Sequence, residues 1–170
     1  GFLSISEPLY TNALGFSDFM IGLIFAGFTL PIFFISTLVG KYIDVRGAKG
    51  ILTAGVSLMA LSTLGFALAQ NPWVLFLLSL VAGVGDALLL PVIYTMLDKL
   101  SSYHGKEKIS GVKIFSESFG YFLGPLIAGL LAGLIGFQNA FWYFGLFIAM
   151  LVFTTIFVPL NHDPIRDRRH

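Results

Sequence analysis

The sequence lacks cysteine altogether and has few charged residues, and each shortage excludes a class of protein. Without cysteine there is no disulfide framework, no thiolate metal site and no thiol redox centre. Of the 170 residues, 11% are charged and 56% are hydrophobic. A soluble domain carries roughly 25% charged residues, so this chain has too few charges to cover a water-facing surface. We therefore expect lipid to be the solvent for most of the chain.

The amino-terminal end lacks both an initiating methionine and a basic stretch before the first apolar run. A secretory signal peptide would need that basic stretch. We expect the chain to be a fragment whose true start lies upstream, with residues 1–14 forming the outer end of a truncated helix.

Long uncharged runs divide the rest of the chain into segments of membrane length. A helix needs about 20 apolar residues to cross the hydrocarbon core. Backbone polar groups cannot stay unpaired in lipid, and continuous apolar runs lack the alternation of a barrel strand, so the segments are expected to be helices. The predicted fold class is an all-α membrane protein. Its complete spans lie near residues 19–40, 50–69, 73–97, 110–135 and 140–160, and a tail follows over 161–170.

All basic residues fall on one side of this threading. They follow the first complete span, recur two spans later, and recur in the tail: Lys41, Arg46, Lys49, Lys99, Lys106, Lys108, Lys113, Arg166, Arg168 and Arg169. The connections near 12–18, 70–72 and 136–139 have none, and Trp73 and Trp142 lie at that opposite boundary. The positive-inside rule predicts cytoplasmic basic loops and a cytoplasmic carboxyl terminus, in a multi-pass protein of the cell (plasma or inner) membrane.

Three carboxylates interrupt the apolar segments: Glu7, Asp86 and Glu117. A mid-helix charge costs about 2.5–3.5 kcal/mol on insertion scales, so such residues normally face a bundle interior or a wet cavity. Counted from the basic ends of their spans, Asp86 lies about 15 Å deep and Glu117 about 10 Å deep. The two acids are expected at similar depth, where the pair would hold a proton near neutral pH and release it when a cation binds. A neutral, hydrogen-bonded structural acid is the alternative for each.

Glycines and prolines gather in the two spans that carry Asp86 and Glu117. In the second of these spans they have the small-xxx-small spacing that lets helices approach closely, together with a proline that bends the helix: Gly120, Gly124, Pro125, Gly129 and Gly133. Gly83, Gly85 and Pro91 give the Asp86 span a similar weak point. Both generic packing and a moving hinge account for this pattern.

The stretch Gly40 to Gly50, GKYIDVRGAKG, resembles the signature loop of the major facilitator superfamily. That pattern has a glycine, an aspartate four residues on, a glycine three further and flanking basic residues, matched here by Gly40, Asp44, Arg46, Gly47 and Lys49. Val45 and Ala48 stand where basic residues are usual, so the copy is degenerate. The resemblance implies a gating role, in which the aspartate caps a neighbouring helix and holds the cytoplasmic side shut. An ordinary basic turn is the alternative.

The stretch Gly120 to Pro125, GYFLGP, followed by Gly129, is similar to the antiporter motif of drug:proton antiporters in this superfamily. Ser79 stands where the amino-terminal half of such transporters usually has an arginine, which favours the carboxy-terminal half; the amino-terminal half is the alternative. Glu7-Pro8 and the Asp86 region resemble vesicular amine transporters, where the acids serve proton coupling and amine recognition. Glu117 is displaced by about a turn from the matching position.

The resemblance implies half of a twelve-helix major facilitator bundle, with about five full helices and one truncated helix around a cavity. It implies proton-coupled antiport or efflux of a small cationic or amphipathic substrate, without a cofactor or a metal. The implied partners are that small-molecule substrate, protons, membrane lipid and the missing half, and no nucleic acid. Lys113 is expected to extend toward the lipid headgroups.

An intramembrane protease and a channel or structural subunit are the alternatives to a transporter. The sequence Gly83 to Asp86 spells the GxGD element of intramembrane aspartyl proteases, but that chemistry needs a second aspartate on the preceding helix. Residues 50–69 contain no acid, so we do not expect an enzyme. A channel or structural membrane subunit stays open, and ohmic current without proton countertransport would distinguish it.

Overall fold

The computed structural model describes residues 2–46, 48–104 and 106–157, apart from the side chains at 37, 40–46, 99–104 and 106–109. All of its regular structure is helical within those ranges, which confirms the predicted all-α fold class. The helices are α1 (Phe2–Ala13), α2 (Asp18–Arg46), α3 (Ala48–Leu68), α4 (Pro72–His104), α5 (Lys106–Ile135) and α6 (Phe137–Phe157).

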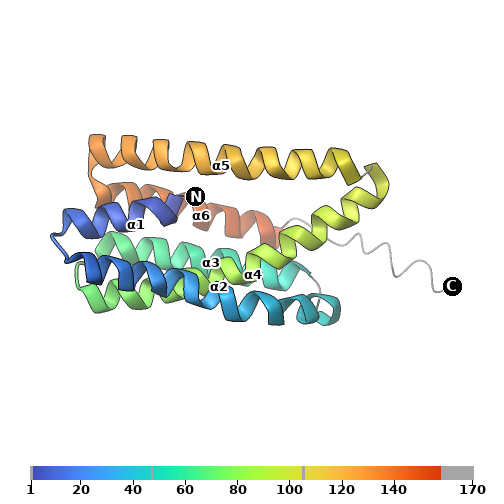
Figure 1. The fold of residues 1–170 in the computed structure, drawn as a ribbon, viewed down its shortest axis with the longest axis horizontal. Coiled ribbons are helices and arrows are strands. Elements are labelled where there is room, and N and C mark those ends of the chain that lie inside the picture. The colour runs from blue at the N-terminus through green and yellow to red at the C-terminus, as the bar shows by residue number, and fades with distance from the viewer. Residues whose placement is uncertain (1, 47, 105, 158–170) are drawn as a thin grey trace.

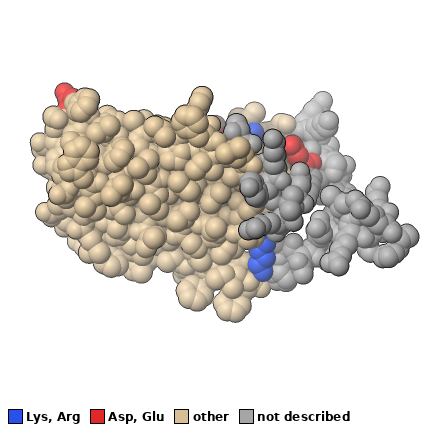
Figure 2. Space-filling model, turned by 90° about the horizontal axis from the view of Figure 1, so that it is seen from below, with Lys and Arg blue, Asp and Glu red and all other residues tan. Residues whose placement is uncertain are grey.

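Five of these helices are long and apolar enough, by length and composition, to cross a membrane. Their apolar windows are Asp18–Ser36, Ala48–Leu68, Pro72–Asp98, Ser110–Ile135 and Phe137–Phe157. The remaining helix, α1, has 12 residues, fewer than a membrane span needs. On the face shown in Figure 2 a broad band carries no charge, and the visible Lys and Arg side chains lie at one edge of that band. The chain is therefore an integral membrane protein.

The helices lie side by side, with α5 along one edge and α1 and α6 between it and the layer of α2, α3 and α4 (Figure 1). The most extensive interfaces join α2 to α4, α3 to α6 and α3 to α4. By contrast, only 6% of the apolar window of α5 is buried. The compact part of this bundle is therefore built on α4, which packs against both α2 and α3.

Two glycines allow α4 to pack closely on both sides. A Cβ atom on Gly83 would overlap the backbone carbonyl of Phe28 in α2, and one on Gly85 would lie 2.9 Å from the carbonyl oxygen of Gly55 in α3. The glycines that were expected to weaken α4 are thus the positions at which it crosses α2 and α3 closely. In van der Waals terms, any larger residue at either position would push a neighbouring helix away.

The glycines of α5 behave differently. A Cβ atom built on Gly120, Gly129 or Gly133 meets nothing within 4 Å. No helix of the described part of this chain approaches these three glycines, so the close approach that their spacing permits stays a prediction. The spacing rule identifies a surface that permits close approach, but it does not say which helix approaches.

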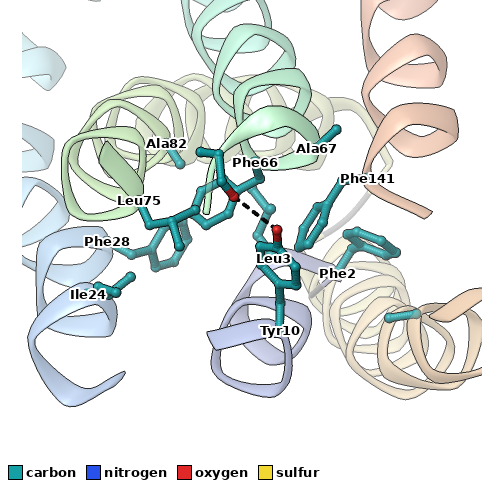
Figure 3. Packing of buried hydrophobic residues seen from close by; sticks show 12 residues of the cluster. Phe2, Leu3, Tyr10, Ile24, Phe28, Phe66, Ala67, Leu75, Ala82 and Phe141 are labelled. Atoms are coloured by element: carbon teal, nitrogen blue, oxygen red, sulfur yellow. Dashed lines mark hydrogen bonds between the residues drawn. The ribbon is translucent and has the colours of Figure 1, made fainter. Parts of the chain in front are cut away.

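Aromatic side chains join α1 to α6 and α3 beside these crossings (Figure 3). The ring of Phe2 stacks on Phe144 with 3.8 Å between centroids, and the Phe141 ring lies edge-on to Phe2 at 6.0 Å. The Tyr10 hydroxyl, buried in the same cluster, donates a hydrogen bond to the Ala69 carbonyl at 2.9 Å. The short α1 is thus held in the bundle by ring packing and by a satisfied polar group.

Glycine ends the helices at two turns. Gly15 and Gly136 have φ values of 76° and 82°, a backbone region that glycine adopts without steric cost. Gly136 alone separates α5 from α6, so the turn predicted over 136–139 is shorter in the structure. Such a left-handed glycine is a common stop for a helix and lets α6 start at the next residue.

Replacing Gly83 with alanine is expected to lower the free energy of unfolding by about 1–3 kcal/mol, because the added methyl group overpacks the crossing of α2 and α4. Gly22→Ala is the matched control, since a Cβ atom there meets nothing within 4 Å. It should change stability by less than about 0.5 kcal/mol. Circular dichroism during SDS titration in mixed micelles measures both, and equal stability of the two variants would contradict the tight crossing.

Candidate functional site

A cavity of about 280 Å³ lies inside the bundle, and all six helices contribute to its wall. The wall is apolar apart from Ser4 on α1, Asp86 on α4 and Tyr121 on α5. Ligand pockets in proteins typically measure about 300–1,000 Å³ and combine an apolar lining with a few polar groups. The cavity is therefore of the kind that admits a small organic molecule.

Asp86 provides the carboxylate of this cavity, and local packing explains why it stays there. Gly83 and Gly85, within the preceding turn, hold α4 against α2 and α3. Ala82 and Ala87 have no exposed surface, so the helix around Asp86 is enclosed on its packed sides. The half-buried carboxyl group consequently faces an apolar chamber, where an unpaired charge is costly and a bound cation or proton is favourable.

Glu7 occupies a different place, in the interface of α1 with α4. Only 1% of its surface is exposed, and its Oε1 contacts Ser79 Oγ. Ser79 Oγ also lies 2.9 Å from the Leu75 carbonyl oxygen, which only accepts hydrogen bonds. A serine has one hydrogen to donate, so both contacts are hydrogen bonds only if the Glu7 carboxyl is protonated and donates to Ser79. The hydrogen-bond count therefore favours a neutral acid.

Glu117 lies on the exposed surface of α5. It accepts a hydrogen bond from the Tyr94 hydroxyl of α4, at 3.4 Å. The ammonium of Lys113, one turn earlier on α5, lies 3.9 Å from the centroid of the Tyr94 ring. Lys113 thus contacts an aromatic ring of the neighbouring helix, whereas the sequence led us to expect it at the lipid headgroups.

Asp86 and Glu117 have different neighbours in the structure. Glu117 contacts Tyr94, whose backbone is about 12 Å along α4 from Asp86 at the helical rise. Tyr121, one turn beyond Glu117, is the α5 residue that shares the cavity with Asp86. The pairing of the two acids in proton exchange stays a prediction.

The signature stretch lies at the junction of α2 and α3. Gly40, Asp44 and Arg46 belong to the last turns of α2, so this part is helical where a loop was expected, and their side chains and Gly47 lie outside the described residues. Lys49 is described, and its Nζ donates to the Ile156 carbonyl in the last turn of α6 at 2.9 Å. A cation is favourable beside the carbonyl groups that end a helix.

Sequence reasoning missed four polar residues of these sites: Ser4, Ser79, Tyr94 and Tyr121. Tyr121 was detectable in principle, because it stands four residues after Glu117 and so shares its helical face. The partners of Ser79 and Tyr94 depend on how separate helices pack, which spacing along one helix does not reveal. Among the described residues, no group of three His, Asp or Glu residues is placed to hold a metal ion.

Comparison with known proteins gives an independent view. The family model described as Major Facilitator Superfamily matches residues 1–169. Quinolone resistance protein NorA of Staphylococcus aureus is 31% identical over 157 residues, which cover 92% of this chain and 40% of that protein. Multidrug resistance protein 2 of Bacillus subtilis is 22% identical over 161 residues, covering 95% of this chain and 40% of that protein. The chain thus spans 40% of the length of these curated relatives.

Removing the partner of Glu7 is expected to destabilise the bundle. Ser79→Ala should lower the free energy of unfolding by about 1–3 kcal/mol, because it leaves a buried carboxyl group unpaired. Glu7→Gln keeps a donor for Ser79 and should cost less than about 1 kcal/mol.

The control for Ser79→Ala is Thr29→Val, because the exposed Thr29 hydroxyl bonds only to carbonyls of its own helix. SDS titration in mixed micelles compares the variants. If Ser79→Ala were as stable as Thr29→Val, or if Glu7→Gln were the more damaging change, the neutral hydrogen-bonded acid would be ruled out.

Proposed function

The chain belongs to the Major Facilitator Superfamily, and on that premise we propose that it is the carboxy-terminal half of a secondary active transporter. The transporter exports a small cationic or amphipathic organic compound in exchange for protons. A second six-helix half completes it, and the substrate cavity lies between or within the halves. The fold class, the five membrane-length helices and the match along nearly the whole chain support this architecture.

Asp86 in the apolar cavity is the observation that carries the proposal. An ionisable residue at this depth is expensive and normally marks an ion or substrate path. A proton or an organic cation each removes the cost of the unpaired charge, so the two ligands compete for one carboxylate. Competition for a shared site couples the outward movement of one ligand to the inward movement of the other when only the loaded transporter alternates between its two faces.

The cavity wall and the relatives together suggest the substrate class. Aromatic rings of Phe2, Phe28, Tyr121 and Phe144 line the chamber. Aromatic faces attract organic cations, and their area favours amphipathic molecules over small inorganic ions. The two relatives are named for resistance to quinolones and to multiple drugs. We extend the efflux role to this chain as part of the proposal.

The remaining candidate residues receive supporting roles. We assign Glu7 as a second proton-carrying acid and Glu117 as an acid nearer the basic end of the bundle. The signature stretch is assigned to gating through Gly40, Asp44, Arg46, Gly47 and Lys49. The antiporter motif of Gly120, Gly124, Pro125 and Gly129 is assigned to the bend and the open face of α5. The contact of Lys49 with Ile156 supports the gating role, because it ties the start of α3 to the end of α6.

The threading can be tested directly because the sequence has no cysteine. Gln70→Cys introduces a cysteine in the connection between α3 and α4, which we place outside the cell, and Ser101→Cys introduces one in the last turn of α4, which we place inside. A membrane-impermeant maleimide should label the first in intact cells and the second only after permeabilisation. Labelling of both from the same side would overturn the proposed orientation.

Asp86→Asn should abolish pH-gradient-driven accumulation of an organic cation, because the amide cannot exchange a proton. Asp18→Asn is the matched control: it makes the same chemical change in the exposed first turn of α2. The full-length protein in everted vesicles, with ethidium fluorescence as the signal, measures both. Undiminished proton-driven accumulation in Asp86→Asn would refute the coupling.

A further inference from the structure

We propose that Tyr94 and Glu117 form a second, ammonium-binding subsite, and that Lys113 of the same chain occupies it in this conformation. The subsite lies between α4 and α5, toward the basic end of the bundle. Its ligand class is an organic ammonium ion. The inference rests on the proposed function, because a transporter of organic cations gives such a subsite its use.

The geometry is that of a cation seated on an aromatic ring with an acid beside it. The Lys113 Nζ lies 3.9 Å from the Tyr94 ring centroid, well inside the range of about 6 Å for cation–π attraction. Glu117 accepts the hydrogen bond of the Tyr94 hydroxyl. Hydrogen bonding to a carboxylate polarises the phenol, which makes the ring a better acceptor for a positive charge.

Both α5 residues reach the ring for a simple helical reason. Lys113 and Glu117 are four residues apart, so their side chains share one face of α5. That face meets Tyr94 where α4 passes antiparallel to α5. The arrangement presents an aromatic face and a carboxylate together, which are the two groups that recognise an organic ammonium ion.

The subsite lies close to the cavity along the same two helices, α4 and α5. Tyr121 is one turn from Glu117 on α5 and lines the cavity that contains Asp86. Tyr94 is about 12 Å from Asp86 along α4, in the direction of the basic end. Tyr94 and Glu117 are both exposed in this chain, so none of its own helices has to unfold for a ligand to reach them. A cation that moves along α4 and α5 therefore meets this subsite before or after the cavity.

Lys113 acts as a tethered competitor. A group held on the same helix has a high effective concentration, so a free cation must displace it to use the ring. Removing the lysine ammonium should therefore expose the subsite. The structure thus assigns Lys113 a role in limiting affinity, which a simple headgroup anchor would not have.

The test measures binding of benzyltrimethylammonium to the purified full-length protein by isothermal titration calorimetry. Lys113→Gln should tighten the Kd by about tenfold, the size of a partly desolvated cation–π contact. Lys113→Met should act in the same way, and Lys113→Arg should not. Adding Tyr94→Leu or Glu117→Gln to Lys113→Gln should remove the gain.

Arg168→Gln is the control, because it removes one positive charge at a position that is assigned neither to gating nor to the subsite. Equal tightening by Arg168→Gln and Lys113→Gln would show a general charge effect and overturn the subsite. Unchanged binding in both Lys113→Gln and Lys113→Met would overturn it as well.

The experiments can refute the proton-coupled transport function and the Tyr94–Glu117 subsite independently of each other. If Asp86→Asn abolishes proton-driven accumulation but Lys113→Gln leaves the Kd unchanged, the transport function stands and the subsite is wrong. If Lys113→Gln tightens binding while Asp86→Asn accumulates cation normally, the subsite stands and the proton coupling is wrong.

Discussion

The cost of holding a carboxyl group at membrane depth is the constraint on which the rest of this structure depends. Each of the three acids meets that cost in a different way. Asp86 faces a cavity, Glu7 is buried with Ser79 as its partner, and Glu117 lies on the α5 surface beside the Tyr94 hydroxyl. In lipid, no water compensates an unpaired charge, so the surroundings of each acid indicate what it is able to bind.

Backbone packing creates the site that Asp86 uses. Without side chains at Gly83 and Gly85, α4 approaches α2 and α3 closely, and the next residue along the chain is the acid of the cavity. The helices are closely packed there, while α5 is the least buried of the membrane-length helices. A firmly held acid beside a loosely packed helix suits a site whose walls must rearrange during transport.

Composition and charge placement predicted the fold class and the five membrane-length helices, because these follow from the demands of lipid on any chain. The superfamily was predicted separately, from the resemblance of two stretches, 40–50 and 120–125, to its motifs. Partners between helices were not predictable in the same way. The contacts of Glu117 with the Tyr94 hydroxyl and of Lys113 with the Tyr94 ring depend on the register between α4 and α5, which the sequence does not reveal. The α5 glycines mark a permissive surface, yet within the described chain the close approach occurs at the α4 glycines instead.

The central claim is that one cavity carboxyl group exchanges a proton for an organic cation. The most direct measurement is proton release when ethidium is added to the purified full-length protein in weakly buffered detergent solution, followed with a pH indicator. The account predicts protons released in proportion to the cation bound, and no release by the Asp86→Asn protein. Cation binding without proton release, or undiminished release by Asp86→Asn, would contradict it.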